Sequence, residues 1–377
     1  MEKLLHVGLD VGSTTVKIVV MDSNLNVIYR NYRRHFSDTK NTVCNVLEEL
    51  INKYSTNEFT IALTGSGAMS ASKFLDLPFI QEVVSCKRAV EKYIPQTDVV
   101  IELGGEDAKI IYFDKSIEQR MNGTCAGGTG AFIDQMASLL NTDTEGLNEL
   151  AKNHSTIYPI ASRCGVFAKT DIQPLLNEGA AKEDIAASIF QAVVNQTISG
   201  LAQGRPIRGA VAFLGGPLNY LSELRNRFIE TLNLTPNNII IPDEAHLLVA
   251  KGAALDSLNA KPISCEKLKS KIDVLKNSHD DTTNPLPPLF KTDAEYEEFK
   301  QRHAKDQVKK GDLSTFKGDV FVGIDAGSTT TKLVAIDRER NATLLIIRKQ
   351  RGQSLTKCYK NAKTTLHRNS QRSYYSL

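Results

Sequence analysis

Two copies of one short pattern, 315 residues apart, constrain the fold of this chain more than any other feature of its sequence. The first copy covers residues 7–22 and the second covers residues 322–337, and they match at ten of sixteen positions. Each copy is an apolar β-run interrupted by a turn of small residues, which predicts a β-hairpin. The chain therefore begins one α/β module and later begins a second.

The small residues of the first copy are of the types that bind a nucleotide triphosphate with magnesium. Gly12 lets the backbone approach a bulky anion without a Cβ in the way. Ser13, Thr14 and Thr15 offer hydroxyl and amide donors, and Asp10 supplies a carboxylate for a hydrated divalent cation. A tight hairpin with an aspartate at its mouth has the same short pattern, so it is the repetition that favours a nucleotide site.

A second glycine turn lies within residues 98–113, between two apolar runs. Gly104 and Gly105 are followed directly by Glu106 and Asp107. Paired glycines permit close approach of the backbone to phosphate, and a carboxylate at such a turn orients magnesium or an attacking water. An ordinary hairpin explains the same residues equally well.

A glycine-rich segment containing Cys125 precedes a predicted helix. Apolar residues at 132, 133, 136, 139 and 140 form one helical face, so the glycine-rich segment is the expected helix entry. A thiol there lies near free backbone amides and the positive end of the helix dipole, which favours a thiolate and stabilises an anionic metal cluster. A cysteine in a buried loop is the alternative interpretation.

A second candidate ligand, Cys164, lies 39 residues farther on in an apolar segment beside one glycine and one arginine. Two cysteines do not complete the four thiolates of an iron–sulfur cube, whereas a two-fold dimer supplies four. The remaining cysteines show no C-x-x-C spacing. We expect them to be small buried apolar side chains: Cys44, Cys86, Cys265 and Cys358.

Composition and charge exclude several classes of function. The formal net charge is +3, but eight Lys or Arg and no acidic residue occur from Thr343 onward, so residues 1–342 carry a net charge of −5. No nucleic-acid partner is therefore expected. No apolar run has the length that spans a bilayer, and the N-terminus lacks a secretory cleavage pattern. We expect a cytoplasmic protein without a membrane partner.

Four stretches occur in the order typical of the actin-like, sugar-kinase and heat-shock-chaperone ATPases: residues 10–15, 102–107, 214–217 and 250–254. Within that superfamily, Cys125-Ala-Gly-Gly-Thr-Gly130 and Ser162-Arg-Cys164-Gly-Val-Phe167 resemble the BadF/BadG/BcrA/BcrD ATPase family. The best-known members of that family activate 2-hydroxyacyl-CoA dehydratases. The resemblance covers about residues 4–258, starts again at 319, and implies a two-lobed, actin-like (ribonuclease H-like) α/β fold.

The resemblance also implies the cofactors, the partners and the site residues. ATP and Mg²⁺ would bind between the lobes, and Cys125 and Cys164 of each subunit in a homodimer would hold one shared [4Fe-4S] cluster. ATP hydrolysis would drive an electron, supplied by a ferredoxin or flavodoxin, to a 2-hydroxyacyl-CoA dehydratase-like or benzoyl-CoA reductase-like component. The residues assigned to hydrolysis are Asp10, Glu106 and Asp107, and those assigned to nucleotide binding are Gly12, Ser13, Thr14, Thr15, Lys17, Gly104, Gly105, Gly215, Gly216 and Pro217.

The chain divides into four expected parts: an ATPase domain (1–258), a linker with a charged helix (259–318), the incomplete start of a second ATPase module (319–344) and an irregular basic tail (345–377). A capping-box pattern at Thr292 and Glu295 predicts the start of the charged helix. The second hairpin has no second lobe, so we expect its turn to be functionally idle and the chain to be a truncated form of a longer two-module protein. A basic tail for RNA or an acidic partner is the alternative.

Two other functions agree with part of the pattern. A small-molecule kinase of the same superfamily predicts phosphate transfer to an acceptor and cysteines that can be replaced without loss. A non-catalytic nucleotide-binding scaffold predicts ATP binding with no reduction of a partner. The sequence contains no separate acceptor-binding insertion, which ranks the kinase below the activator.

Overall fold

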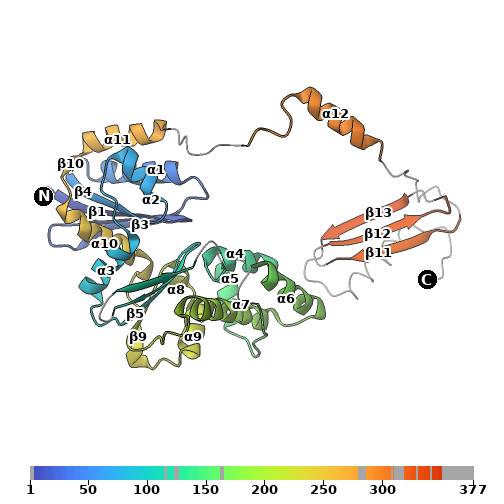
Figure 1. Ribbon diagram of the computed structural model, residues 1–377, viewed down its shortest axis with the longest axis horizontal. Coiled ribbons are helices and arrows are strands. Elements are labelled where there is room, and N and C mark those ends of the chain that lie inside the picture. Colours follow the sequence, from blue (N-terminus) through green and yellow to red (C-terminus); the bar gives the residue numbers. More distant parts are fainter. Residues whose placement is uncertain are drawn as a thin grey trace. The chain divides into compact units, whose positions relative to one another are not determined.

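The computed structural model describes residues 4–113, 117–122, 127–161, 165–278, 286–306, 309, 318–327, 330–339 and 342–349. The chain divides into two compact units: residues 1–169 with 182–279, and residues 170–181 with 280–377. The first unit contains two α/β lobes, and the second contains a three-stranded sheet (Figure 1).

The first lobe is built on a five-stranded mixed sheet in the order β10-β4-β1-β2-β3. β1 pairs antiparallel with β2 and parallel with β4, so the first predicted hairpin forms and lies at the centre of the sheet. The strands of this sheet are β1 (Leu4–Val11), β2 (Thr15–Met21), β3 (Val27–Arg34), β4 (Glu58–Thr64) and β10 (Ile263–Ser264).

Helices cover both faces of this first sheet (Figure 1). On one face, α1 (Thr39–Lys53), α2 (Ala68–Leu75) and α11 (Cys265–Asn277) share an apolar core with the strands. Asp38 caps the start of α1, where its side chain accepts a hydrogen bond from the Asn41 amide, and the helix buries an apolar face on the sheet. On the other face, α10 (Leu248–Asp256) packs against β1 and β2.

The first lobe extends beyond residue 258, where the ATPase domain was expected to end. β10 pairs antiparallel with β4, with Ile263 opposite Phe59. α11 buries Leu268 and Ile272 in the core of the lobe. The lysines of α11 lie mostly on the outer face of this amphipathic helix, and the packed lobe continues to residue 278.

The second lobe repeats the plan of the first, with a sheet in the order β7-β6-β5-β8-β9. β5 pairs antiparallel with β6 and parallel with β8, as β1 does with β2 and β4. The predicted strands on both sides of the second glycine turn, at Gly104 and Gly105, are therefore confirmed. The strands are β5 (Val99–Leu103), β6 (Ala108–Tyr112), β7 (Glu118–Met121), β8 (Val211–Leu214) and β9 (Ile239–Ile240).

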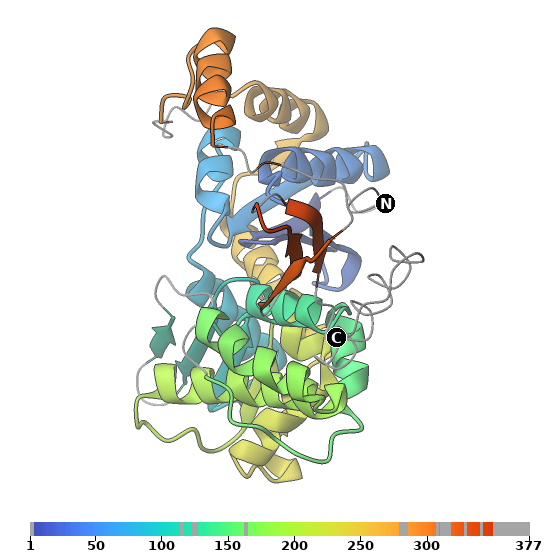
Figure 2. The same ribbon diagram turned by 90° about the vertical axis from the view of Figure 1, so that its right-hand side faces the viewer.

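Helices of the second lobe lie on its sheet and against one another. α3 (Glu82–Tyr93) and α10 share an apolar core with β5, β6 and β8. α4 (Gly130–Leu139), α5 (Thr144–Ala151), α7 (Lys182–Thr197) and α9 (Ser222–Thr231) pack together, green to yellow in Figure 2. The remaining helices of the chain between β7 and α9 are α6 (Gly165–Glu178) and α8 (Gly216–Tyr220).

α10 contains the stretch 250–254, one of the four that carry the family resemblance, and it touches both lobes. A Cβ added at Gly8 of β1 would lie 2.0 Å from the Ala250 carbonyl oxygen of α10. A Cβ added at Gly252 would lie 1.8 Å from the Ser85 carbonyl oxygen of α3. Glycines at these two places therefore let the backbones of β1, α10 and α3 approach one another closely.

The segment Lys182–Ala202 is long and apolar enough to cross a membrane by length and composition alone, contrary to the expectation that the chain has no such run. However, 67% of its apolar window is buried inside the fold. The segment comprises α7 and a π-helical turn (Ile198–Ala202), and α7 packs against α5 and α9. This burial is that of a core helix.

The second unit contains the repeated hairpin, which forms as predicted. β11 (Phe321–Ala326) pairs antiparallel with β12 (Thr330–Ile336), and β12 pairs with β13 (Ala342–Lys349). The expectation that residues after 345 have no strand structure is therefore wrong as far as Lys349, because β12 offers that run a pairing edge. Residues 350–377, the rest of the expected tail, lie outside the described residues.

α12 (Asp293–Ala304) is the charged helix expected in the linker. Thr292 accepts a hydrogen bond from the Glu295 amide, as the capping-box pattern predicted. The ring of Phe290 lies 5.3 Å from that of Tyr296 and 5.2 Å from that of Phe299, measured between centroids. The ring of Phe290, which precedes the helix, thus packs against two aromatic side chains of α12 and forms a small apolar cluster with them.

Candidate active site

The turn between β1 and β2 is held by hydrogen bonds within its own backbone and by hydrogen bonds with His35. The Gly12 amide donates to the Thr15 carbonyl (2.9 Å), and the His35 amide donates to the Thr14 carbonyl (3.1 Å). His35 Nε2 also lies 3.1 Å from the Gly12 carbonyl oxygen, and the His35 ring is buried. Sequence reasoning missed His35, because no local pattern connects a residue after β3 with the first turn.

Asp10 lies inside β1 and not in the turn where the sequence placed it. Lys17, its partner in the strand pairing, donates from Nζ to Asp10 Oδ2 at 2.7 Å. Burial raises the pKa of the Asp10 carboxyl, although the charge of Lys17 opposes this shift. Asp10 Oδ1 is buried without a hydrogen-bond partner among the described residues, and so is Oγ1 of Thr64, which is paired with Asp10 on β4. An orphaned carboxylate oxygen of this kind suits a hydrated Mg²⁺ ion.

The second glycine turn, between β5 and β6, meets the first turn directly. A Cβ added at Gly105 would lie 2.1 Å from Oγ1 of Thr14, so only glycine permits this approach. The amides of Gly130 and Ala131, at the start of α4, donate to the carbonyls of Gly104 (3.0 Å) and Gly105 (2.7 Å). The helix that follows the Cys125 segment therefore begins on the second glycine turn.

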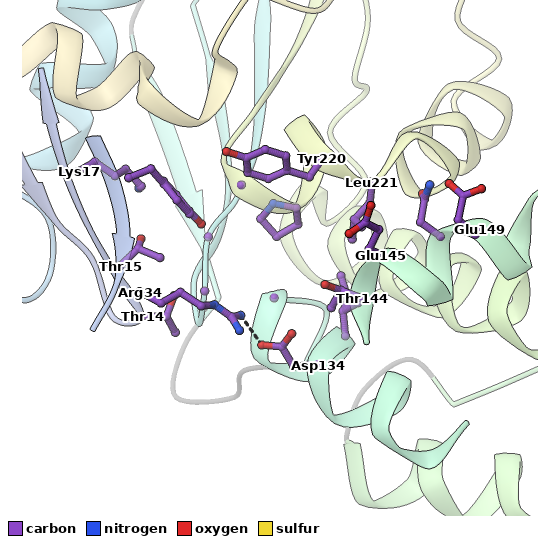
Figure 3. A pocket seen from close by; sticks show the side chains of 18 residues that line it. Thr14, Thr15, Lys17, Arg34, Asp134, Thr144, Glu145, Glu149, Tyr220 and Leu221 are labelled. Carbon is purple, nitrogen blue, oxygen red and sulfur yellow. Dashed lines mark hydrogen bonds and ion pairs between the residues drawn. The ribbon is translucent and has the colours of Figure 1, made fainter. Parts of the chain in front are cut away.

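A pocket of about 500 Å³ lies where these elements meet (Figure 3). A volume in this range accepts a small organic ligand. Among the residues predicted to bind nucleotide, the pocket brings together Thr14, Thr15, Lys17, Gly104, Gly105, Gly216 and Pro217. Its lining does not include the predicted residues Asp10, Gly12, Ser13, Glu106, Asp107 and Gly215. Glu106 is exposed in its turn, and the roles given to Glu106 and Asp107 stay predictions.

Sequence reasoning missed the residues that line the rest of the pocket. α5 contributes Thr144, Glu145 and Glu149, which lie opposite the threonines of the first turn in Figure 3. Arg34 of β3 meets Asp134 of α4 in an ion pair at 2.5 Å. None of these side chains belongs to a short motif, because they come from separate elements that only the folded lobes bring together.

Aromatic rings lie at the side of the pocket formed by α8. The ring of His246 packs against Tyr32 and Tyr220, at centroid distances of 5.3 and 5.1 Å, and both tyrosines line the pocket. A Cβ added at Gly216 would lie 3.0 Å from the Tyr32 hydroxyl oxygen. Burial, followed by the charge of Lys17, lowers the pKa of His246 to about 4, so its ring is neutral at physiological pH. Tyr32 and Tyr220 line the same pocket as Pro217, so this side of the pocket is rich in apolar ring surface.

A buried group of charges lies beneath the second turn. Lys109 Nζ donates to Glu82 Oε1 at 2.6 Å and lies 4.0 Å from Glu102 Oε1. Burial raises the pKa of Glu102 to about 7, although Lys109 opposes the shift. Burial alone lowers the pKa of Lys109, but the carboxylates of Glu102 and Glu82 outweigh it and raise that pKa. Glu102 Oε2 has no hydrogen-bond partner within the described part of the chain.

Both candidate cluster ligands, Cys125 and Cys164, lie outside the described residues, as does Cys358. Within the described ranges no group of three or more His, Cys, Asp or Glu side chains could hold a metal ion. Cys44 and Cys86 are buried free thiols, as expected, and burial raises the pKa of each. Cys265 was expected to be buried as well, but it is only half-buried, and its thiol donates hydrogen bonds to the carbonyl oxygens of Tyr54 and Asn57, both at 3.4 Å.

A family model described as the BadF/BadG/BcrA/BcrD ATPase family matches residues 7–257. The match covers more than half of the chain, and the chain belongs to this family of ATPases. The 2-hydroxyisocaproyl-CoA dehydratase activator of Clostridioides difficile is 31% identical over 272 residues, which are 70% of this chain and 98% of that protein.

Two solved structures share the two-lobed plan. Component A of the Acidaminococcus fermentans (R)-2-hydroxyglutaryl-CoA dehydratase has a TM-score of 0.60 and 25% identity, covering 71% of this chain and 99% of that one. The activator of the Clostridium difficile 2-hydroxyisocaproyl-CoA dehydratase was solved with bound ADPNP. It has a TM-score of 0.58 and 27% identity, and the match covers 74% of this chain and 100% of that chain. The fold of this chain is the two-lobed actin-like ATPase fold, as the sequence predicted.

Proposed function

We propose that this chain is an ATP-driven activator that passes a low-potential electron to a CoA-ester dehydratase-like or benzoyl-CoA reductase-like partner. Membership of the ATPase family supports this function, as do relatives named as activators of 2-hydroxyacyl-CoA dehydratases. In the proposal two copies of the chain, in the cytoplasm, share one [4Fe-4S] cluster through Cys125 and Cys164 of each copy. A ferredoxin or flavodoxin supplies the electron.

The position of α4 is the observation that carries the proposal, because this helix lines the pocket and also lies beside the start of α6. Gly130, Ile133 and Asp134 of α4 line the pocket. A Cβ added at Gly165, the first residue of α6, would lie 3.6 Å from the Phe132 ring of α4. Cys125 shortly precedes α4 and Cys164 directly precedes α6 in the sequence. A change at the phosphate end of the pocket therefore has a short route to both cysteine segments.

The two glycine turns would hold the phosphates of ATP. Thr14 and Thr15 offer donors on one side of the pocket, and Gly105 gives the phosphates access to backbone on the other. Asp10 Oδ1, which has no partner among the described residues, would hold Mg²⁺ directly or through its water. The base would lie toward Pro217 and Tyr220, which offer it apolar ring surfaces.

The cysteine segments would bind the cluster with help from the helices that follow them. A [4Fe-4S] cluster, when bound, supplies one electron at low potential. The positive ends of the helix dipoles at the starts of α4 and α6 would favour the thiolate forms of Cys125 and Cys164. Two such cysteines from each of two copies complete the four thiolates that the cluster takes from protein.

The test is an anaerobic purification with iron and sulfide counted per chain. We expect about two irons per chain, since one four-iron cluster is shared by two copies. Cys125→Ala should lose the iron and the brown colour, whereas Cys265→Ala, at a cysteine outside the proposed site, should retain both. The visible spectrum should also change on addition of ATP. A colourless protein that still binds ATP would leave a kinase or a nucleotide-binding scaffold and refute the activator.

A further inference from the structure

Arg34 and Asp134 join the two lobes across the mouth of the pocket. Arg34 is the last residue of β3 in the first lobe, and Asp134 lies in the second turn of α4 in the second lobe. Arg34 Nη2 lies 2.5 Å from Asp134 Oδ2, and both residues line the pocket (Figure 3). The side chains of Arg34 and Asp134 are 48% and 38% exposed to solvent. The ion pair is therefore open to solvent and to any ligand that enters the pocket.

Arg34 is the pocket cation that a ligand can most readily recruit. Among the described residues that line the pocket, the cationic side chains are Lys17 and Arg34. Lys17 is mostly buried and donates to Asp10 at 2.7 Å, so its charge is already engaged inside the first lobe. An arginine guanidinium binds phosphate oxygens in a bidentate manner, and an exposed ion pair contributes little stability that would oppose a change of partner.

We propose that Arg34 exchanges partners when ATP binds, leaving Asp134 for the terminal phosphate of the nucleotide. This inference rests on the proposed ATP-driven function and assigns to Arg34 the role of a residue that distinguishes ATP from ADP. A triphosphate carries several negative charges, whereas Asp134 carries one, so the bound phosphate competes well for the guanidinium. ADP lacks the terminal phosphate and leaves the ion pair in place.

The exchange acts on the helix that links the pocket with the cysteine segments. Two sets of polar interactions hold α4. Its first amides donate hydrogen bonds to the carbonyls of Gly104 and Gly105, and its Asp134 forms an ion pair with Arg34. Release of Asp134 removes the ion pair and leaves the hydrogen bonds of the α4 amides in place. Because the Phe132 ring of the same helix lies beside Gly165 at the start of α6, a shift of α4 would reach the segments that carry Cys125 and Cys164.

The first experiment compares the affinities of two variants for a non-hydrolysable ATP analogue and for ADP by titration calorimetry. Arg34→Ala should weaken analogue binding by about tenfold, the effect of losing one charge-assisted hydrogen bond. Asp134→Asn should strengthen it several-fold, because Arg34 no longer has to leave a carboxylate. ADP affinity should change little in either variant. An ion pair that only ties the lobes together would instead make both variants bind more weakly, and that result would overturn the proposal.

The neighbouring pair of Arg33 and Glu49 provides a matched control. Arg33 donates to Glu49 at 2.9 and 3.1 Å with similar exposure, but both residues belong to the first lobe and neither lines the pocket. Arg33→Ala and Glu49→Gln should leave both affinities unchanged. If they reproduce the effects of Arg34→Ala and Asp134→Asn, the effects arise from general surface charge and the proposal fails.

Hydrogen exchange gives a second readout that does not depend on affinity. The amides of α4 in wild-type protein should exchange differently with the ATP analogue than with ADP, and Asp134→Asn without nucleotide should resemble the analogue-bound state. Equal exchange in all these states would contradict the role of the ion pair. Neither experiment requires iron, so a protein without a cluster would refute the proposed electron transfer while still testing the exchange.

Discussion

Lys17 Nζ lies 2.7 Å from Asp10 Oδ2 across the first hairpin, with 14% and 2% of the two side chains exposed. The repeated hairpin makes the same contact between Lys332 and Asp325, also at 2.7 Å, but with 46% and 63% exposed. One local sequence thus forms one local ion pair in two surroundings. Only the first pair is buried next to a pocket.

Replacing the two aspartates separately should therefore have very different effects. Asp10→Asn should reduce the ATPase rate by at least about 100-fold, because the proposed magnesium ligand loses its charge. It should also destabilise the first lobe by on the order of 3 kcal/mol, since Lys17 is left without its buried partner. Asp325→Asn should change neither quantity measurably. The measurements are the ATPase rate per folded molecule and the melting temperature of each variant. A folded Asp10→Asn protein with wild-type activity would contradict the role of Asp10 as a magnesium ligand.

The close approach of β1 to α10 predicts a second contrast between the repeats. Gly8→Ala should destabilise the protein by about 3 kcal/mol, since the added Cβ meets the Ala250 carbonyl oxygen at 2.0 Å and both backbones must move. Gly323→Ala is the matched substitution in the second hairpin, where nothing lies within 4 Å of the added Cβ, and it should be tolerated. Urea unfolding of both variants measures the difference. Equal losses would show that strand propensity, and not packing on α10, decides the effect.

The buried Glu102 carboxyl predicts a dependence of stability on pH. Its pKa is about 7 in the folded protein against an ordinary value of 4.5, so the folded state binds the proton more tightly than the unfolded state does. This group therefore makes stability fall as pH rises from about 4.5 to 7, by on the order of 2–3 kcal/mol once ionised. Glu102→Gln should remove that fall. Relative to the wild type, the variant should therefore be more stable at pH 8 than at pH 5. Unfolding by urea at both pH values, without magnesium, tests this; the same pH slope in both proteins would exclude Glu102 as its source.

The contact between the two glycine turns predicts a loss of nucleotide binding without a loss of fold. In Gly105→Ala the added Cβ meets Oγ1 of Thr14 at 2.1 Å, so the first turn must shift away from the second. We expect ATP affinity to fall by about tenfold or more, because donors aimed at the phosphates move together with Thr14. Melting temperature should change by only a few degrees, since the clash is with a side chain at the surface of the pocket. Unchanged affinity would place the phosphates elsewhere.

Much of the fold was predictable because its signals are local. The two hairpins, the glycine turn after β5, the start of α4 and the capped start of α12 each depend on a few consecutive residues, whose side chains determine the backbone geometry directly. The family resemblance then placed these pieces in a two-lobed fold. The strand β13 was not predicted, because the basic composition of that run gives no sign of the pairing edge that β12 offers it.

The composition of the pocket was less predictable, because its residues meet only after folding. Arg34 and Asp134 are separated by 100 residues and belong to different lobes, and no local pattern relates them. His35 holds the first turn from beyond β3 in the same way.

The repeated hairpin separates the two kinds of information most clearly. Its sequence is enough to form the strands, the turn and the ion pair of Lys332 with Asp325, because hydrogen bonds between adjacent strands need no other part of the chain. Burial of the corresponding Asp10, and the tight contact of Gly8, arise only because β4 and α10 lie against β1 in the first lobe. Local sequence therefore specifies the hairpin, whereas the packing of distant segments decides that one hairpin borders a pocket and the other is open to solvent, since burial is a property of all the neighbours together.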